Sequence, residues 1–355
     1  MGGRDSQRVG AVVSIGARAL VIGALICIAA CLVGCSSATP GTMPVPSGST
    51  PPEAAPATAS SPASPPTGSR PAAPSTVLPP TEQVVGLAAG TSDEASGIAA
   101  STKTPGAYFL VDDGTGTDNI VAVGSDGAVI GRVTIDGMAA DNAEALAAGS
   151  CGTSPAPGDP TALTCLYIGD IGDNAAKRHD IAIFRIAEPD VDAATPVPAD
   201  EWRYTYPQGA QNAESLMVEP DGSLIIVTKP NPGSGLPHRM YRGEPGGGEL
   251  TLVREFRPPA AQIPLRTLFT GNVVTDLAVA PGRVLLLTYD ELQEYSAPDP
   301  GADLTGFPDW PHHRLPMPPL PQAEGVTPAA DGCGYVVASE AGPGGSHGWL
   351  GLVGC

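Results

Sequence analysis

A short pattern, a small or acidic residue followed by apolar residues, recurs five times in this chain. The copies are SGIAA (96–100), EALAA (144–148), ESLMV (214–218), TDLAV (275–279) and EGVTP (324–328). Each copy is followed by a turn and then by further short apolar runs bounded by Gly, Pro and Asp, which are typical of β-strands. A repeat of roughly 50 residues with up to four strands predicts an all-β fold, a β-propeller of five blades.

The remaining strands of each unit are expected from the same alternation of apolar runs and turns. Second strands are expected at 107–113, 165–171, 223–229, 283–289 and 334–340, third strands at 119–124, 180–186, 238–243, 292–297 and 349–354, and fourth strands at 128–135, 201–206, 250–256 and 312–317. The fifth unit lacks a fourth strand, and EQVVGLA (82–88) would supply it from the N-terminal side. Such closure leaves no open sheet edge. A six-blade ring with one degenerate blade and a β-sandwich are the alternatives.

The first 34 residues have the pattern of a signal peptide, with three arginines followed by the apolar run ALVIGALICIAACLVG (19–34). The letters LVGC at 32–35 resemble the lipobox of bacterial lipoproteins. This resemblance implies that Cys35 becomes an acylated, palmitate-type N-terminus. We therefore expect a protein of the cell envelope, lipid-anchored to the outer face of a bacterial membrane. An uncleaved membrane helix over 11–34 is the alternative.

Residues 35–80 are rich in Pro, Ser, Ala and Thr, and Glu53 and Arg70 are their only charged residues. A segment of this composition cannot bury enough apolar surface to order itself. We predict a disordered tether here, followed by a propeller domain over 81–355.

Four cysteines remain once the leader and Cys35 are set aside, which in an exported protein favours disulfides. In the blade arrangement, Cys151 ends a first strand beside Cys165, which begins the second. Cys333 and Cys355 flank neighbouring strands of the last unit in the same way. We predict the bonds Cys151–Cys165 and Cys333–Cys355 on one face. A zinc site would be the alternative, but the Cys-x-x-Cys spacing is absent.

The chain is acidic, with a formal net charge of −19. Loss of residues 1–34 would leave 15 basic and 36 acidic residues, a net charge of about −21. Such a chain repels nucleic acid, which we exclude as a partner.

Polar residues begin the five first strands and end the second strands, so they are expected to meet at one mouth of the central channel, opposite the disulfides. The first strands place Ser96 and Thr275 there together with three glutamates. The candidate ligand face consists of Glu144, Glu214, Glu324, Asp112, Asp113, Asp170, Asp173, Lys229 and Glu340, with Tyr289 beside them.

Crowded carboxylates have two chemical uses. Mutual repulsion raises pKa values and creates acid–base groups, or a Ca²⁺ ion neutralises them, with Asp113 and Asp170 as candidate metal ligands. The loop DDGTGTDN (112–119) lacks the spacing of an EF-hand. Asp, Asn and Gly are also ordinary turn formers, and the repeated glutamates could instead bind the backbone of a neighbouring blade.

Other motifs are weak. GGSHG (344–348) matches the G-x-S-x-G pattern of serine hydrolases, but it lies between two predicted strands where the mechanism needs a strand-to-helix elbow. No phosphate-binding loop and no dinucleotide fingerprint is present.

The segment YIGDIGDNAAKRHDIAIFRIAEP (167–189) is similar to segments of uncharacterised exported bacterial propeller proteins, a resemblance that implies fold and export. Propellers of phytase-like and lactonase-like enzymes have acidic mouths that bind calcium, but their ligand sets do not map onto these residues. The leading hypothesis is a membrane-anchored binding or scaffold module, without catalysis, for an envelope protein or a small molecule. The alternative is a calcium-dependent hydrolase of a phosphoester or lactone that uses the mouth carboxylates.

Overall fold

The computed structural model describes residues 81–92, 94–152, 163–262, 270–330, 332, 334–342 and 344–354. The expected signal peptide (1–34), the lipidation site Cys35 and the tether (35–80) lie outside these residues. Within the described part of the chain, no helix is long and apolar enough to cross a membrane.

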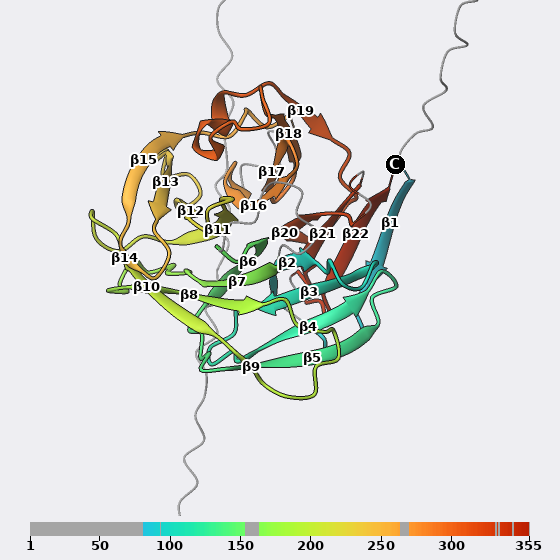
Figure 1. Cartoon of the computed structure of the whole chain (residues 1–355). Coiled ribbons are helices and arrows are strands. Elements are labelled where there is room, and N and C mark those ends of the chain that lie inside the picture. The colour runs from blue at the N-terminus through green and yellow to red at the C-terminus, as the bar shows by residue number, and fades with distance from the viewer. Residues whose placement is uncertain are drawn as a thin grey trace, which may run out of the picture. The chain divides into compact units, whose positions relative to one another are not determined.

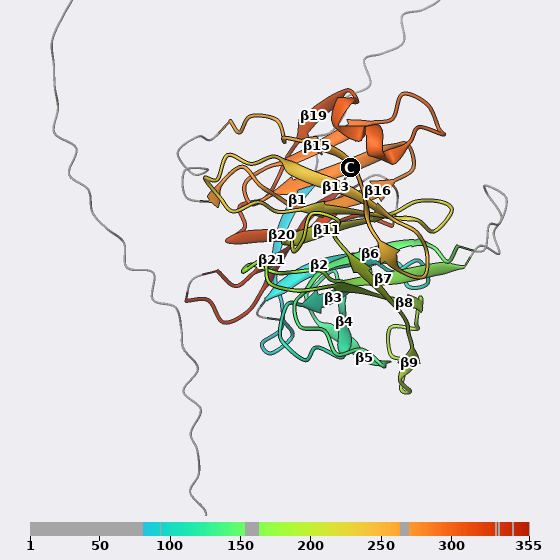
Figure 2. The same cartoon turned by 90° about the vertical axis from the view of Figure 1, so that its left-hand side faces the viewer.

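The described strands form five antiparallel blades around a channel (Figures 1 and 2). Blade 1 consists of β2 (Ala95–Ala100), β3 (Ala107–Asp112), β4 (Asn119–Gly124) and β5 (Val129–Asp136). Blade 2 consists of β6 (Ala143–Ser150), β7 (Thr164–Asp170), β8 (Ile181–Ala187) and β10 (Asp200–Thr205). Blade 3 consists of β11 (Ala213–Val218), β12 (Leu224–Thr228), β13 (His238–Gly243) and β15 (Thr251–Phe256). Blade 4 consists of β16 (Val274–Ala280), β17 (Arg283–Thr288), β18 (Leu292–Ser296) and β19 (His312–Leu315). Blade 5 consists of β20 (Gln322–Pro328), β21 (Tyr335–Glu340), β22 (Trp349–Gly354) and β1 (Thr81–Gly86). The five-blade prediction is confirmed.

The N-terminal strand closes the ring as expected. β1 is the outer strand of blade 5 and pairs antiparallel with β22, with Thr81 opposite Gly354 and Gly86 opposite Trp349. The first and last strands of the domain are therefore held together by main-chain hydrogen bonds, and blade 5 has no edge at β22.

Every inner strand contains a β-bulge at the same place. The pairing of β2, β6, β11, β16 and β20 with their second strands skips one residue near the start of each inner strand. The skipped residues are Ser96, Glu144, Glu214, Thr275 and Glu324. Because a bulge re-aims a side chain, the repeat brings these five positions to one end of the channel.

The apolar core lies between blades. Five clusters of buried side chains each combine residues of two neighbouring sheets. The cluster between blades 5 and 1 includes Leu350 and Leu110. The inner strands of each sheet are thus buried on both faces, which explains why they read as nearly continuous apolar runs, whereas the outermost strands β1, β5, β10, β15 and β19 keep exposed residues.

Two short strands cross between blades and were not expected. β9 (Val197–Pro198), in a loop of blade 2, pairs parallel with β5 of blade 1, and β14 (Gly248–Glu249), in a loop of blade 3, pairs parallel with β10 of blade 2. A side chain at Gly131 would lie 2.2 Å from the carbonyl of Val191, so glycine is needed where the first of these loops crosses β5.

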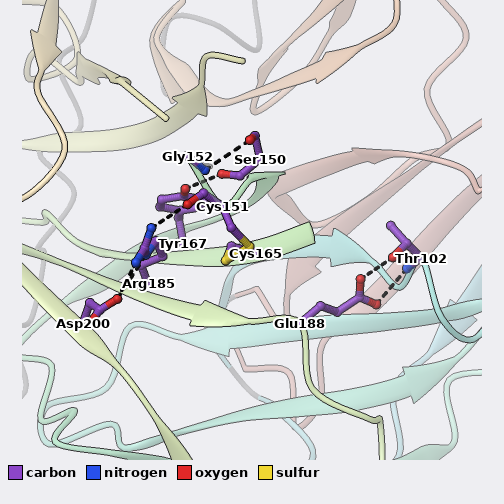
Figure 3. The surroundings of a disulfide bond; sticks show 9 residues. All are labelled: Thr102, Ser150, Cys151, Gly152, Cys165, Tyr167, Arg185, Glu188 and Asp200. Carbon is purple, nitrogen blue, oxygen red and sulfur yellow. Dashed lines mark hydrogen bonds and ion pairs between the residues drawn. A yellow bond between two sulfur atoms is a disulfide. The ribbon is translucent and has the colours of Figure 1, made fainter. Parts of the chain in front are cut away.

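The disulfide Cys151–Cys165 is confirmed, with a Cα–Cα distance of 5.0 Å. Arg185 fixes its surroundings by donating from Nη1 to the carbonyl of Cys151 at 2.7 Å and by pairing with Asp200 (Figure 3). Cys333 and Cys355 lie outside the described residues, so their pairing stays a prediction.

Candidate ligand site at the channel mouth

The five bulged side chains are buried at the mouth where the inner strands begin. Glu144, Glu214 and Glu324 are only 4–6% exposed, and Ser96 and Thr275 are equally enclosed. Three carboxyl groups in such a setting are costly unless they are protonated, paired or hydrogen-bonded.

Lys229, which follows β12, supplies the positive charge of the mouth. Its Nζ forms an ion pair with Glu214, lies 3.9 Å from Glu324 Oε2 and donates to the hydroxyl of Tyr289 at 2.5 Å. Burial lowers the pKa of Lys229, but Glu214 and Glu324 raise it more, so the ammonium stays charged. The same carboxylates and burial raise the pKa of Tyr289, which remains a neutral phenol.

Glu144 and Glu324 each accept a hydrogen bond from an amide side chain that lies two residues earlier in the chain. Asn142 Nδ2 donates to Glu144 Oε1 at 2.7 Å. Gln322 Nε2 donates to Glu324 Oε1 at 2.9 Å and to Glu340 Oε2 at 2.6 Å, and so joins two carboxyl groups of blade 5. Neither amide was among the predicted site residues, although the spacing N-x-E and Q-x-E is visible in the sequence.

Burial and mutual repulsion keep several mouth carboxyls protonated near neutral pH. Burial, with Glu214 and Asp113 next, raises the pKa of Glu144 to about 9. Burial and Glu324 raise the pKa of Glu340 to about 8. Burial and the nearby Glu94 raise the pKa of Asp113 to about 7. These causes show that carboxyls from blades 1, 2, 3 and 5 act on one another across the mouth.

Blade 1 contributes its acidic groups from the rim. Asp112 ends β3 and accepts a hydrogen bond from Ser92, while the main-chain nitrogen of Asp113 donates to the carbonyl of Glu94. Glu94 is an exposed residue that sequence reasoning did not select, and it is one of the causes of the raised pKa of Asp113.

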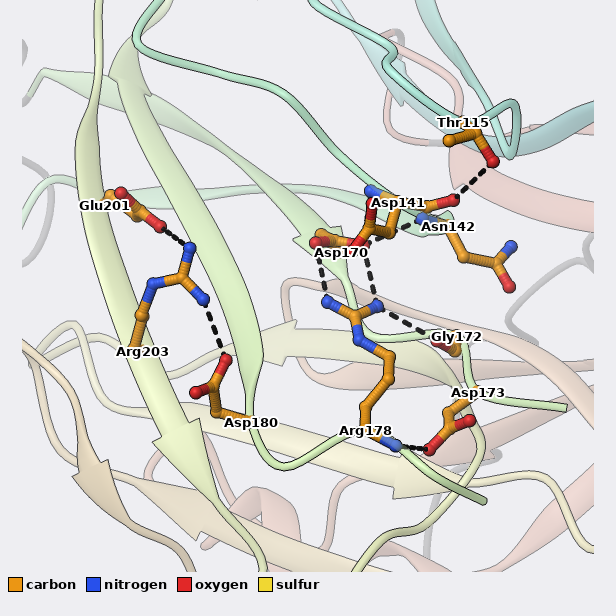
Figure 4. Close-up of polar contacts among 10 residues, drawn as sticks. All are labelled: Thr115, Asp141, Asn142, Asp170, Gly172, Asp173, Arg178, Asp180, Glu201 and Arg203. Carbon is orange, nitrogen blue, oxygen red and sulfur yellow. Dashed lines mark hydrogen bonds and ion pairs between the residues drawn. The ribbon is translucent and has the colours of Figure 1, made fainter. Parts of the chain in front are cut away.

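Asp170 and Asp173 have a different role, shown in Figure 4. Asp170 ends β7 and binds both Nη atoms of Arg178 at 2.7–2.8 Å and the main-chain nitrogen of Asn142 at 2.9 Å. Asp173 accepts from the main-chain nitrogens of Lys177 and Arg178 at 2.7 Å. The two aspartates of GDIGDN therefore bind their own loop and its neighbour, and their contacts support the segment that carries Asn142.

Glycine is needed in this loop. A side chain at Gly172 would lie 2.4 Å from Asn142 Oδ1 and 2.6 Å from Glu144 Cγ. The close approach lets the loop after β7 pack directly against the Asn142–Glu144 pair.

Asp276, next to the bulge of blade 4, was missed by sequence reasoning. It is 3% exposed, and its carboxylate accepts from the main-chain nitrogens of Leu277 at 2.7 Å and Val326 at 2.8 Å. Burial raises its pKa well above the usual range. Asp276 links inner strand β16 to inner strand β20. It thus binds the backbone of a neighbouring blade, the role that the sequence suggests as an alternative for the repeated glutamates.

The residues at the mouth do not have the arrangement of a metal centre. Among the described residues, no three His, Cys, Asp or Glu side chains are grouped so that they could hold a metal ion. Of the two predicted metal ligands, Asp170 is engaged by Arg178 and Asp113 stands at the rim. The cation that lies between Glu214 and Glu324 is the ammonium of Lys229.

No protein-family model and no curated protein sequence matches this chain. Among solved structures, regucalcin, a calcium-binding protein of Agrobacterium tumefaciens strain C58, aligns at 11% identity over 76% of this chain and 96% of its own, with a TM-score of 0.39. A glucose dehydrogenase aligns at 10% identity over 77% of this chain and 99% of its own, with a TM-score of 0.41. A nidogen–laminin complex aligns at 10% identity over 69% of this chain and 72% of its own, with a TM-score of 0.34.

Proposed function

We propose that this protein is a lipid-anchored binding module of the bacterial cell envelope, and that its channel mouth binds a cationic group of its ligand. The observation that carries the proposal is the excess of carboxyls over bases at the mouth: the buried Glu144 and the half-buried Asp113 and Glu340 have raised pKa values, while Lys229 is already paired with Glu214. A bound ammonium or guanidinium would favour the ionised carboxyls and displace their protons.

The topology is compatible with ligand access to the mouth of an anchored protein. β1 begins at Thr81, opposite Gly354, on the face where the inner strands end. β1 thus begins on the face opposite the mouth.

Isothermal titration of the full chain with spermidine, in two buffers of different ionisation enthalpy, tests the ligand class. We expect binding that strengthens from pH 6 to pH 9 and releases protons, and that weakens at least tenfold in the double variant Glu144→Gln/Glu340→Gln. The matched control, Glu249→Gln, removes an exposed carboxyl of β14 and should bind as the unchanged protein does. Binding that is equal in the double variant and in the control would overturn the proposal.

Thermal unfolding of the full chain with and without Ca²⁺ addresses the alternative, a calcium-dependent hydrolase of a phosphoester or lactone. The specific observation behind it is that Glu144 and Asp113 have pKa values of about 9 and 7, which suit a general acid and a general base near neutral pH. A calcium-dependent rise in Tm that is lost in Asp113→Asn would favour this alternative and justify substrate screening.

Anchoring is tested separately. Cys35→Ser should move the protein from the membrane fraction to the soluble fraction and abolish incorporation of labelled palmitate. Retention in the membrane would instead favour an uncleaved helix over 11–34.

A further inference from the structure

A cavity lies at the end of the propeller opposite the mouth, on the face where the inner strands end. It has a volume of about 530 Å³ and lies beneath blades 2, 3 and 4, between the ends of β6, β11 and β16 and the loop that joins β18 to η1 (Leu304–Asp309). Its volume is in the range of about 300–1,000 Å³ that is typical of ligand pockets.

The walls of this cavity are mainly apolar. Val218, Val279 and Leu304 line it together with Trp310 and the half-buried Ala302. Trp310 lines the cavity and is 8% exposed. Apolar groups left open to water are unfavourable, and a ligand that covered them would gain hydrophobic free energy.

Three of its four charged lining residues are already in ion pairs, and the fourth, the exposed Asp299, accepts from the main-chain nitrogen of Gly301 at 3.0 Å. Glu219 pairs with Arg242 at 2.6 Å, and the same guanidinium lies 3.3 Å from Asp303. Arg283 pairs with Glu294 at 2.8 Å and donates to the carbonyl of Gly332. A charged ligand would therefore have to compete with existing ion pairs, whereas an uncharged ligand would not.

The cavity is also pre-organised. Asp303 caps η1 by accepting from the main-chain nitrogen of Thr305 at 2.9 Å, and the carbonyl of Thr305 accepts from Arg254. The main-chain nitrogens of Ala297 and Ala302 donate to Gly282 and Asp299 within the wall. A ligand would meet a wall whose backbone is already ordered, which reduces the entropic cost of binding.

We propose that this cavity binds an uncharged, largely apolar small molecule, independently of the acidic mouth. The two sites lie at opposite ends of the channel, and the residues that line one do not line the other. The ligand class follows from the mainly apolar wall, the indole of Trp310 and the ion pairs that already engage Glu219, Arg283 and Asp303.

The test uses the full chain with N-phenyl-1-naphthylamine as a neutral fluorescent probe, in one detergent for all variants. We expect saturable binding with energy transfer from tryptophan to the probe, and loss of most of that transfer in Trp310→Phe, which retains Trp202 and Trp349. Ala302→Phe fills the cavity and should weaken binding at least tenfold, and Ala302→Leu should weaken it less. Ala139→Phe, at an exposed position, is the matched control.

Glu144→Gln separates this proposal from the one for the mouth, because it should leave probe binding unchanged. If Ala302→Leu, checked for an unchanged circular dichroism spectrum, and Ala139→Phe bind the probe equally, the proposal is wrong. Absence of saturable binding would also overturn it, whatever the outcome of the spermidine titration.

Discussion

The two ends of the channel are built from the same five inner strands but differ in chemistry. At the mouth, bulged residues place three glutamates around Lys229. Beyond the bulges the channel narrows to a space of about 50 Å³ that is lined mainly by apolar residues. Its lining includes Ile98, Leu146, Leu216, Leu277 and Val326.

This difference shows that the one extra residue of each bulge marks the boundary between a polar site and a packed core. The bulge adds a residue to each inner strand, and in blades 2, 3 and 5 that residue can be a glutamate because an amide side chain or the ammonium of Lys229 contacts its carboxyl group. The residues that directly follow the bulges are Gly97, Ala145, Ser215 and Gly325, which are small, and Asp276, which binds the backbone of β20. The stability that the mouth contributes should therefore depend on pH and on ion pairing. The stability that the opposite end contributes should depend on packing and on the disulfide.

Removal of the central ammonium should have the largest effect. Lys229→Met leaves Glu214 and Glu324 buried without their cation, which should lower the free energy of unfolding by about 3–5 kcal/mol at pH 8. The loss should be smaller at pH 5, where the carboxyls are protonated. Urea unfolding measures it, and Lys229→Met/Glu214→Gln should recover a large part. A loss at pH 8 below 0.5 kcal/mol would contradict the ion-pair description.

The disulfide should contribute nearly as much at the other end, but without pH dependence. Replacing both Cys151 and Cys165 by Ser opens a loop with a sequence separation of 14 and should cost about 3 kcal/mol. The same cost at pH 5 and pH 8 in urea unfolding is the expected result. A cost that changed strongly with pH would show that the two ends are coupled.

The pH dependence of stability should come from the mouth. The pKa of Glu144 is about 9 in the folded protein against an ordinary value of 4.5, so the folded state holds a proton that the unfolded state releases. This contribution to stability is present below pH 4.5 and is lost as the pH rises toward 9, by roughly 1.4 kcal/mol per pH unit for one such group. Glu144→Gln should flatten this slope, whereas Leu146→Ala should lower stability at every pH without changing the slope.

An exposed ion pair should matter least. Arg203 pairs with Asp180 and Glu201 on the outer part of blade 2, with a side chain that is 60% exposed (Figure 4). Arg203→Met should change the free energy of unfolding by no more than about 0.5 kcal/mol. Arg178→Met, which leaves the buried Asp170 without its bidentate partner, should cost clearly more in the same assay.

The blade architecture was predictable because each strand is short, apolar and bounded by turn residues. Even the poor fourth strand of blade 4, interrupted by prolines, forms as β19, although it ends at Leu315 rather than Met317. The crossing strands β9 and β14 were not predictable, because two-residue parallel pairings between blades leave no local pattern. The need for glycine at Gly131 becomes visible only when the carbonyl of Val191 is seen to lie beside it in the structure.

The mouth was predictable as a location but not in its pairings. The repeat identified Glu144, Glu214 and Glu324, whose strands bring them to the same end. It did not distinguish them from Asp170, which has equivalent placement at a strand end but is held by Arg178. Asp276 was overlooked because the residue that follows each bulge is small in the other four blades.

The order of the strands, the closure of the ring and the Cys151–Cys165 bond follow from local patterns and chain order, since hydrophobic period and turn residues act over a few positions. The partner of each buried charge does not, because Lys229 with Glu324, Gln322 with Glu340, and Asp276 with Val326 meet only when two strands or two blades pack together. The apolar cavity beneath blades 2, 3 and 4 has the same origin, since its walls come from three sheets and one loop. Burial and pairing are properties of the packed structure, and they decide which polar residues are structural and which face a ligand.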